Sequence, residues 1–157
     1  CLRFENEFQQ KHYRIPPLSL ILETLHEHAL AIDFALLGLI WFIQLIVYPS
    51  FRFIEPDRFQ DWHSIYCHRV SYFVLPLMTM QLIDSTSSCF FVGDPSSWLR
   101  LSSVIVAWTI TFAYSAKRHK ALSEKGKNQR EIDSLIRMNW LRTLFWTLPF
   151  FISWLVY

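Results

Sequence analysis

The chain has 157 residues, of which 52% are hydrophobic and 17% aromatic, and its formal net charge is only +2. Its mean hydropathy of +0.21 is higher than soluble domains of this size usually show. This composition predicts an integral membrane protein whose first partner is the lipid bilayer. The small net charge argues against a nucleic-acid-binding protein, because that class presents a strongly basic surface.

Four runs are long enough to cross a membrane, which takes about 20 mostly apolar residues for about 30 Å of hydrocarbon. With their flanks, we expect helices over about residues 30–48, 57–92, 98–116 and 138–157. The second helix starts at Pro56 and Asp57, which suit a helix N-terminus, so it extends about three turns beyond the membrane. Because the connections are short, residues 30–157 are predicted to form one all-α antiparallel four-helix bundle.

Residues 1–29 are expected to form a tail and an interfacial amphipathic helix within "PPLSLILETLHEHAL". If that helix continued unbroken from Leu18 to Tyr48, it would measure about 46 Å, longer than the bilayer is thick. Cys1 is either the lipid-modified N-terminus of a mature chain or a truncated start, and both alternatives stay open.

Basic residues predict the orientation. The connection over residues 117–137 carries seven Lys or Arg, whereas the turn over residues 93–97 carries none. Because Lys and Arg flank membrane helices on the cytoplasmic side, we expect loop 117–137 in the cytoplasm and both termini on the opposite side. Topology and attraction to anionic lipid headgroups explain these charges without nucleic acid.

Polar residues inside apolar helices predict an outer polar layer. A charged group at the bilayer centre costs at least about 2.5–3.5 kcal/mol, so such groups should face the bundle interior. Asp33 in the first helix lies at about the depth of Gln81 and Asp84 in the second. Two acids this close would share a proton, capture a cation or pair with Arg100. The interpretation favoured by sequence alone is that Asp84 and Arg100 lie in water at the interface.

At the cytoplasmic end, all four helices contribute hydrogen-bonding groups to one depth. The predicted cluster, also a candidate ligand site, comprises Gln44, Tyr48, His63, Tyr66, Arg69, His119, Asn139 and Arg142. Arg142 lies one turn inside the membrane, where a protein acceptor costs less than lipid contact. We therefore expect Arg142 and Asn139 to tie the fourth helix to the ends of the first and third.

Histidine spacing does not predict a metal site within one helix. His63 and His68 lie about 140° apart around a helix, and His26 and His28 about 200° apart, so neither pair chelates one ion from one face. A shared ligand would require His63 and His119 to meet across two helices. We predict no catalytic residue, no metal site and no cofactor, with haem, a metal or a quinone at His63 and His119 as the alternatives.

Five segments carry a resemblance to known proteins: "QLIVYPSF", "FQDWHSIYCHRV", "VLPLM", "TFAYSAKRHKALSEKG" and "NWLRTLFW". In this order they resemble small four-helix bacterial membrane proteins of unknown function and, more distantly, the anthrone-oxygenase-like membrane family. The resemblance covers about residue 28 to the end. It implies a location in a bacterial inner membrane. Its motif positions in this sequence are Gln44, Tyr48, Pro49, His63, Arg69, Pro76, Met78, His119, Asn139, Trp140, Arg142 and Thr143. Gln81 replaces an expected glutamate and Ser115 an expected proline.

Two functions are compatible with these patterns. Seven Trp and 14 Phe provide wide aromatic faces, which suit the helices of other subunits. The first hypothesis is therefore a non-catalytic accessory or structural subunit that docks onto a larger membrane complex. The alternative is a small membrane oxidoreductase or ligand-binding protein, which uses His63, His119 and Tyr66 at a cytoplasmic-side pocket on a lipophilic aromatic or quinone-like molecule.

Overall fold

The computed structural model describes residues 17–156, which are almost entirely helical and contain no strand. The first elements are α2 (Leu18–Glu27), α3 (Ala29–Phe42), the π-helix η1 (Ile43–Val47), α4 (Tyr48–Ser50) and the 3₁₀-helix η2 (Phe51–Phe53). They are followed by α5 (Pro56–Phe91), α6 (Pro95–Ile110), the π-helix η3 (Thr111–Ser115), α7 (Ala116–Lys125) and α8 (Gln129–Val156). The fold class is therefore all-α.

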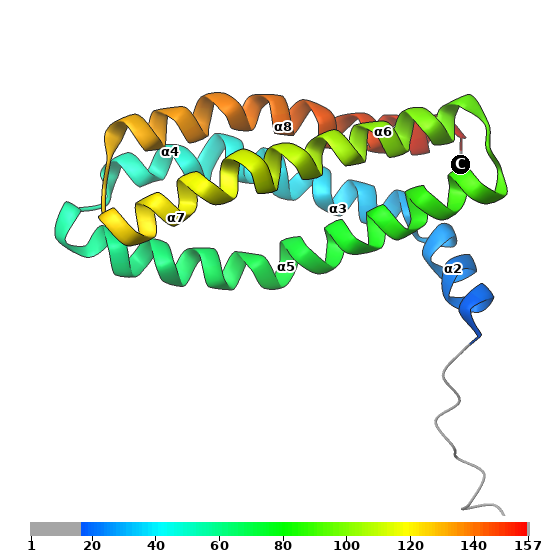
Figure 1. Ribbon diagram of the computed structural model, residues 1–157, viewed down its shortest axis with the longest axis horizontal. Helices are drawn as coiled ribbons and strands as arrows, with labels where there is room; N and C mark the ends of the chain where they lie inside the picture. The colour runs from blue at the N-terminus through cyan, green and yellow to red at the C-terminus, as the bar shows by residue number, and fades with distance from the viewer. Residues whose placement is uncertain (1–16, 157) are drawn as a thin grey trace, which may run out of the picture.

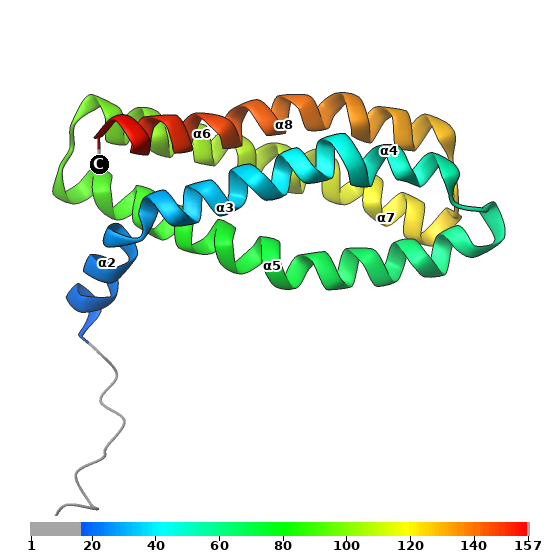
Figure 2. The same cartoon turned by 180° about the vertical axis from the view of Figure 1, so that it is seen from behind.

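These elements form long rods that lie side by side, with consecutive rods running in opposite directions (Figures 1 and 2). The first rod is α3 to η2, the second is α5, the third is α6 to α7, and the fourth is α8. α8 packs against α3 and α6, and α5 packs against the same two helices. Helix α2 leaves this assembly at the end where the C-terminus lies, and it contacts α5.

Local sequence explains where the rods begin and end. Pro56 and Pro95 each occupy the first turn of a helix, where the missing N–H costs nothing. Asp94 caps α6, because its carboxylate accepts a hydrogen bond from the Ser97 backbone N–H at 3.0 Å. Gly126 ends α7 with φ +78°, a conformation that favours glycine.

Two helix boundaries differ from the sequence prediction. The interfacial helix does not run on unbroken into the first rod: α2 ends before His28, whose ring Nδ1 donates to the Thr24 carbonyl at 2.9 Å and so caps α2. The expected loop over residues 117–137 is mostly helical, and only residues 126–128 connect α7 to α8. The helices extend this far because Leu122 and Ile132 are buried there, and because Arg118 pairs with Glu131 at 2.8 Å.

The rods bury two hydrophobic clusters, which include Leu36 and Leu122, together with many polar groups, and they also expose large apolar side chains. Two of them, Ala29–Phe53 and Pro95–Lys125, are long and apolar enough to cross a membrane, with mean hydropathies of 2.3 and 1.3. The buried polar and charged residues are Asp33, Gln44, His63, Gln81, Asp84, Ser85, Ser88, Arg100, Ser103, Ser115, Asn139, Arg142, Thr143 and Ser153. Large side chains such as Phe73, 68% exposed, and Trp154, 63% exposed, cover the outside.

Candidate functional site

A charged cluster lies where α3, α5, α6 and α8 meet near the end that carries α2. Arg100 Nη2 contacts Asp33 Oδ2 at 2.9 Å, and Arg100 Nη1 contacts Asp84 Oδ2 at 2.5 Å. Both carboxylate side chains are 0% exposed and Arg100 is 3% exposed. The interpretation that Asp84 and Arg100 lie in water is therefore wrong, because the two carboxylates give Arg100 enough hydrogen-bonding partners to be buried.

Neutral groups and His26 complete this cluster. Gln81 Nε2 donates to Asp33 Oδ1 at 2.7 Å, and the Ser153 hydroxyl donates to Asp33 Oδ2 at 2.6 Å. His26 Nδ1 from α2 lies 3.2 Å from Asp84 Oδ1. The predicted outer layer of Asp33, Gln81 and Asp84 is thus brought together around Arg100. The cluster ties all four rods to one another at this depth.

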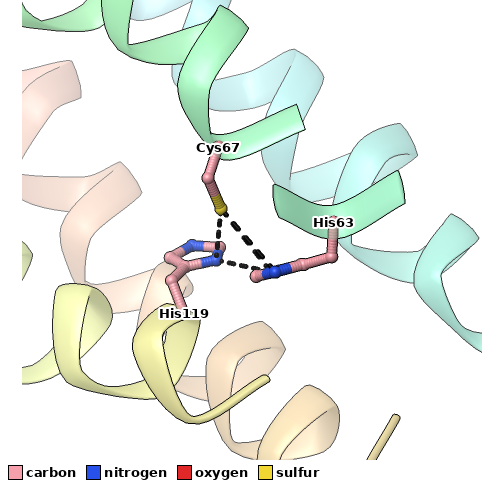
Figure 3. A group of neighbouring side chains, drawn as sticks. All are labelled: His63, Cys67 and His119. Carbon is pink, nitrogen blue, oxygen red and sulfur yellow. Dashed lines mark hydrogen bonds between the residues drawn. The ribbon is translucent and has the colours of Figure 1, made fainter. Parts of the chain in front are cut away.

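A second cluster lies near the opposite end, between α5 and α7, and consists of His63, Cys67 and His119 (Figure 3). His63 Nε2 lies 3.0 Å from His119 Nδ1. Cys67 Sγ lies 3.7 Å from His63 Nε2 and 3.6 Å from His119 Nδ1. We name these three residues the His–Cys–His cluster. The two histidines therefore meet across two helices, as a shared ligand would require.

The second nitrogen of each imidazole is also hydrogen-bonded. His63 Nδ1 lies 2.9 Å from the Ser123 hydroxyl, and His119 Nε2 lies 2.8 Å from the Tyr48 hydroxyl. His63 and Cys67 precede the apolar part of α5, which begins at Val70. Burial lowers the pKa of His63 to about 4 and raises the pKa of the Cys67 thiol to about 11. At neutral pH, His63 is therefore neutral and the thiol of Cys67 is protonated.

Cys67 was not singled out from the sequence, although a signal was present. It follows His63 by four residues, a spacing that places two side chains on one face of a helix. The partner on α7 was the missing information. Because His119 lies on a different helix, residue spacing could not show that it faces His63 and Cys67.

A pocket of about 170 Å³ opens beside the His–Cys–His cluster. Its walls come from α5 and from the third rod, and Ile43, Tyr48 and Arg142 close it from the other two rods. The lining residues are Ile43, Tyr48, Tyr66, Cys67, Val70, Ser71, Val74, Leu75, Thr111, Ser115, Ala116, His119 and Arg142. The wall is mostly apolar, with polar groups at a few points, as is typical of small-molecule sites.

Both π-helical segments contribute to this pocket. η1 supplies Ile43 and directly precedes Tyr48. η3 supplies Thr111 and Ser115, which lie about two turns and one turn before His119. A π-helical turn holds one residue more than an α-helical turn, so it rotates the side chains that follow it. Such turns are rare and occur frequently at functional sites. Here they help bring Tyr48 and His119 within 2.8 Å of each other.

Arg142 lines the pocket and has no counter-charge. Its side chain is only 6% exposed, yet no carboxylate in residues 17–156 lies within 4.0 Å of its guanidinium. Nη2 donates to the Tyr48 hydroxyl at 3.5 Å, the guanidinium lies 5.2 Å from the Trp146 ring centroid, and Nε has no partner. Arg142 therefore contributes a buried positive charge with hydrogen-bonding capacity to spare.

The other predicted site residues divide into two groups. Asn139 Nδ2 donates to Gln44 Oε1 at 2.6 Å, so with Arg142 it ties α8 to the first rod. The link to the third rod is indirect, through Tyr48 and His119. Tyr66 is half-buried in the pocket wall. Arg69 does not join the cluster and is exposed, because it lies six residues after His63, about 240° around the helix.

Comparisons of this chain with models of protein families, with curated proteins and with solved structures find no match. The resemblance to small four-helix bacterial membrane proteins stays a prediction. Two features that bear on function meet at the pocket: the His–Cys–His cluster and Arg142.

Proposed function

We propose that all four rods cross a membrane and form an antiparallel four-helix bundle within it. The distribution of side chains supports this placement, because Asp33, Asp84 and Arg100 are buried while large apolar side chains face outward. In water, an apolar surface this extensive would be unfavourable, whereas in lipid it is the expected exterior. Helices α5 and α8, which contain more polar residues than the other rods, keep their central polar groups turned inward.

The basic residues at one end of the bundle support a proposal for its orientation. We place the α7–α8 connection in the cytoplasm of a bacterial inner membrane and α2 at the outer interface. A membrane-impermeant maleimide tests this, with Val92→Cys and Lys125→Cys each introduced into a chain whose native cysteines are serine. In intact spheroplasts the maleimide should label the Val92→Cys variant. It should label the Lys125→Cys variant only after the membrane is permeabilised. The reverse pattern would contradict the orientation.

Within this bundle, the best-supported function is binding of a small lipophilic molecule with an acidic or strongly accepting oxygen. The observation that carries it is the buried, unneutralised charge of Arg142 at the pocket wall. Leaving a buried charge without a partner costs several kcal/mol, about 3–5 where a pair is broken. A ligand carboxylate, phenolate or quinone carbonyl at the guanidinium would offset this cost.

The size of the pocket limits the head of such a ligand to about one ring. A buried apolar cavity of about 150 Å³ holds one benzene molecule, and this pocket measures about 170 Å³. Tyr48 and His119 offer further hydrogen-bonding groups at its polar side, whereas Val70 and Val74 are apolar. A single-ring head with an apolar tail that extends into lipid fits these walls.

4-Pentylbenzoate is a suitable probe, and neutral pentylbenzene is its control. The midpoint temperature of unfolding of the purified protein in lipid nanodiscs should rise with the benzoate, because a ligand that binds only the folded state stabilises it. Ala116→Trp, which fills the pocket wall, should abolish the rise. Ala113→Trp, one turn earlier on an exposed face, should keep it. An equal rise in both variants would contradict binding at this pocket.

A second candidate function is the accessory subunit, and the outer face of α3 and α8 favours it. The rings of Trp41 and Trp140 meet edge to face there, with their centroids 5.8 Å apart. The ring centroids of Phe34 and Phe150 are 5.7 Å apart. Rigid aromatic faces of this kind suit the helices of another subunit. Paired Ala substitutions at Trp41 and Trp140 should then release co-purifying chains, and unchanged co-purification would count against docking on this face.

A further inference from the structure

We propose that His63, Cys67 and His119 bind one transition-metal ion of the zinc class, with the fourth coordination position open to the pocket. Zinc in proteins is tetrahedral, with Zn–N of about 2.0–2.1 Å and Zn–S of about 2.3 Å. These bond lengths place two nitrogen ligands about 3.3 Å apart, and nitrogen and sulfur ligands about 3.6 Å apart. The cluster has 3.0 Å between nitrogens, and 3.6 and 3.7 Å from nitrogen to sulfur.

Hydrogen bonds on the far side of both rings support this assignment. A metal-bound histidine almost always donates its other N–H to a nearby acceptor, which fixes its tautomer and orientation. With metal on His63 Nε2, the Nδ1–H would donate to Ser123 Oγ. With metal on His119 Nδ1, the Nε2–H would donate to the Tyr48 oxygen. Both supporting partners are already in place.

The helices deliver the three ligands without contribution from a loop. His63 and Cys67 lie four residues apart on α5, and His119 faces them from α7 (Figure 3). Cys67 and His119 also line the pocket, so an ion held by them lies beside the pocket. Three protein ligands with an open fourth position are typical of zinc sites that bind water or substrate.

The donor atoms select the class of metal. Two imidazoles and a thiolate are borderline-to-soft ligands, which suit Zn²⁺ or copper, whereas Mg²⁺ and Ca²⁺ require oxygen ligands. Binding replaces the thiol proton: the S–H bond breaks, an S–metal bond forms, and one proton is released to solvent. The thiolate then cancels one of the two positive charges, which limits repulsion from Arg142.

This inference goes beyond the proposed function, because the metal binds whether or not the pocket holds a ligand. Its test uses the whole 157-residue chain, stripped with a chelator and titrated with Co²⁺ and then Zn²⁺, with no benzoate present. We expect one Co²⁺ per chain with a sulfur-to-cobalt charge-transfer absorption, which Zn²⁺ displaces. Cys67→Ser should remove that absorption and weaken Zn²⁺ binding by at least about 100-fold.

His68→Gln is the matched control, since His68 is the next histidine on α5 and contacts Tyr72 instead of the cluster. This variant should bind Zn²⁺ as the parent does, and circular dichroism should show that each variant is folded. Arg142→Gln, which targets the benzoate, should keep Zn²⁺ binding, so the two proposals fail separately. Absence of the charge-transfer absorption in the parent, or equal Zn²⁺ affinity in Cys67→Ser and the parent, would overturn the site.

Discussion

Replacing Arg100 by methionine should destabilise the fold far more than replacing any exposed arginine. Arg100 is 3% exposed and contacts two carboxylates that are 0% exposed. Methionine occupies a similar space, so the main effect is loss of the charge. Removing one partner of a buried ion pair costs about 3–5 kcal/mol, because the remaining charge stays buried without compensation. We expect a decrease of this size in the free energy of unfolding.

Arg52→Met is the matched control. Arg52 contacts Asp133 at 2.7 Å, but the two side chains are 46% and 41% exposed. Exposed pairs contribute only about 0–1 kcal/mol. Unfolding by a denaturing detergent, followed by far-ultraviolet circular dichroism in mixed micelles, gives both values under the same conditions.

A double variant separates loss of charge from loss of packing. Asp84→Asn removes one of the carboxylates that Arg100→Met leaves unpaired, so it should restore part of the lost stability in that background. The same substitution in the parent should destabilise it. An equal loss for Arg100→Met and Arg52→Met, or no recovery in the double variant, would refute the reasoning about the buried cluster.

Three further predictions concern local features. Gly126→Ala should lower the free energy of unfolding by about 1–3 kcal/mol, because φ is +78° at Gly126. At Gly38 an added methyl group meets no atom within 4 Å, so Gly38→Ala should be neutral or stabilise α3 by up to about 1 kcal/mol. Equal effects of the two variants on thermal unfolding would contradict this prediction. Asn139→Leu leaves Gln44 Oε1 without its donor and should lower the free energy of unfolding by about 1–3 kcal/mol in the detergent-unfolding assay. An unchanged free energy of unfolding would contradict the role of Asn139 in tying α8 to the first rod. Hydrogen bonds from Ser96 and Ser97 lower the pKa of Asp94 from 3.8 to about 2. The stability that the Asp94 carboxylate contributes is therefore fully present above about pH 4 and is lost as the pH falls through about 2. The midpoint temperature of unfolding should fall less steeply between these pH values in Asp94→Ala than in the parent. Identical pH profiles in the two proteins would contradict the role of Asp94 as a helix cap.

The sequence predicted the helical character and the main polar positions because these depend on local information. Apolar runs and the spacing of Gln81 and Asp84 are visible along one helix. Pairing of Arg100 with the two acids was one of the alternatives, but local sequence could not select it over an Arg100 exposed to water. Its sequence position near a helix start indicates an interface with water, and only the meeting of α3, α5 and α6 shows that two carboxylates enclose it.

The candidate site was partly predictable for the same reason. Tyr48, His119 and Arg142 were identified by depth, but the π-helical turns that aim Tyr48 and His119 into the pocket leave no clear pattern in the sequence. Cys67 acquires a role only through its distance to His119. The absence of a carboxylate beside Arg142 among the described residues could likewise not be predicted, because the sequence does not show which residues of the other helices lie near its guanidinium.

Binding of 4-pentylbenzoate to the parent and to Arg142→Gln tests the ligand-binding function most directly. Isothermal titration calorimetry in nanodiscs, with empty nanodiscs and pentylbenzene as references, measures the contribution of the guanidinium. A hydrogen bond to a charged group contributes about 1.5–3 kcal/mol, so the variant should bind the benzoate at least about 10-fold more weakly while pentylbenzene behaves alike in both. Equal benzoate affinity in the two proteins would contradict a pocket built around the charge of Arg142.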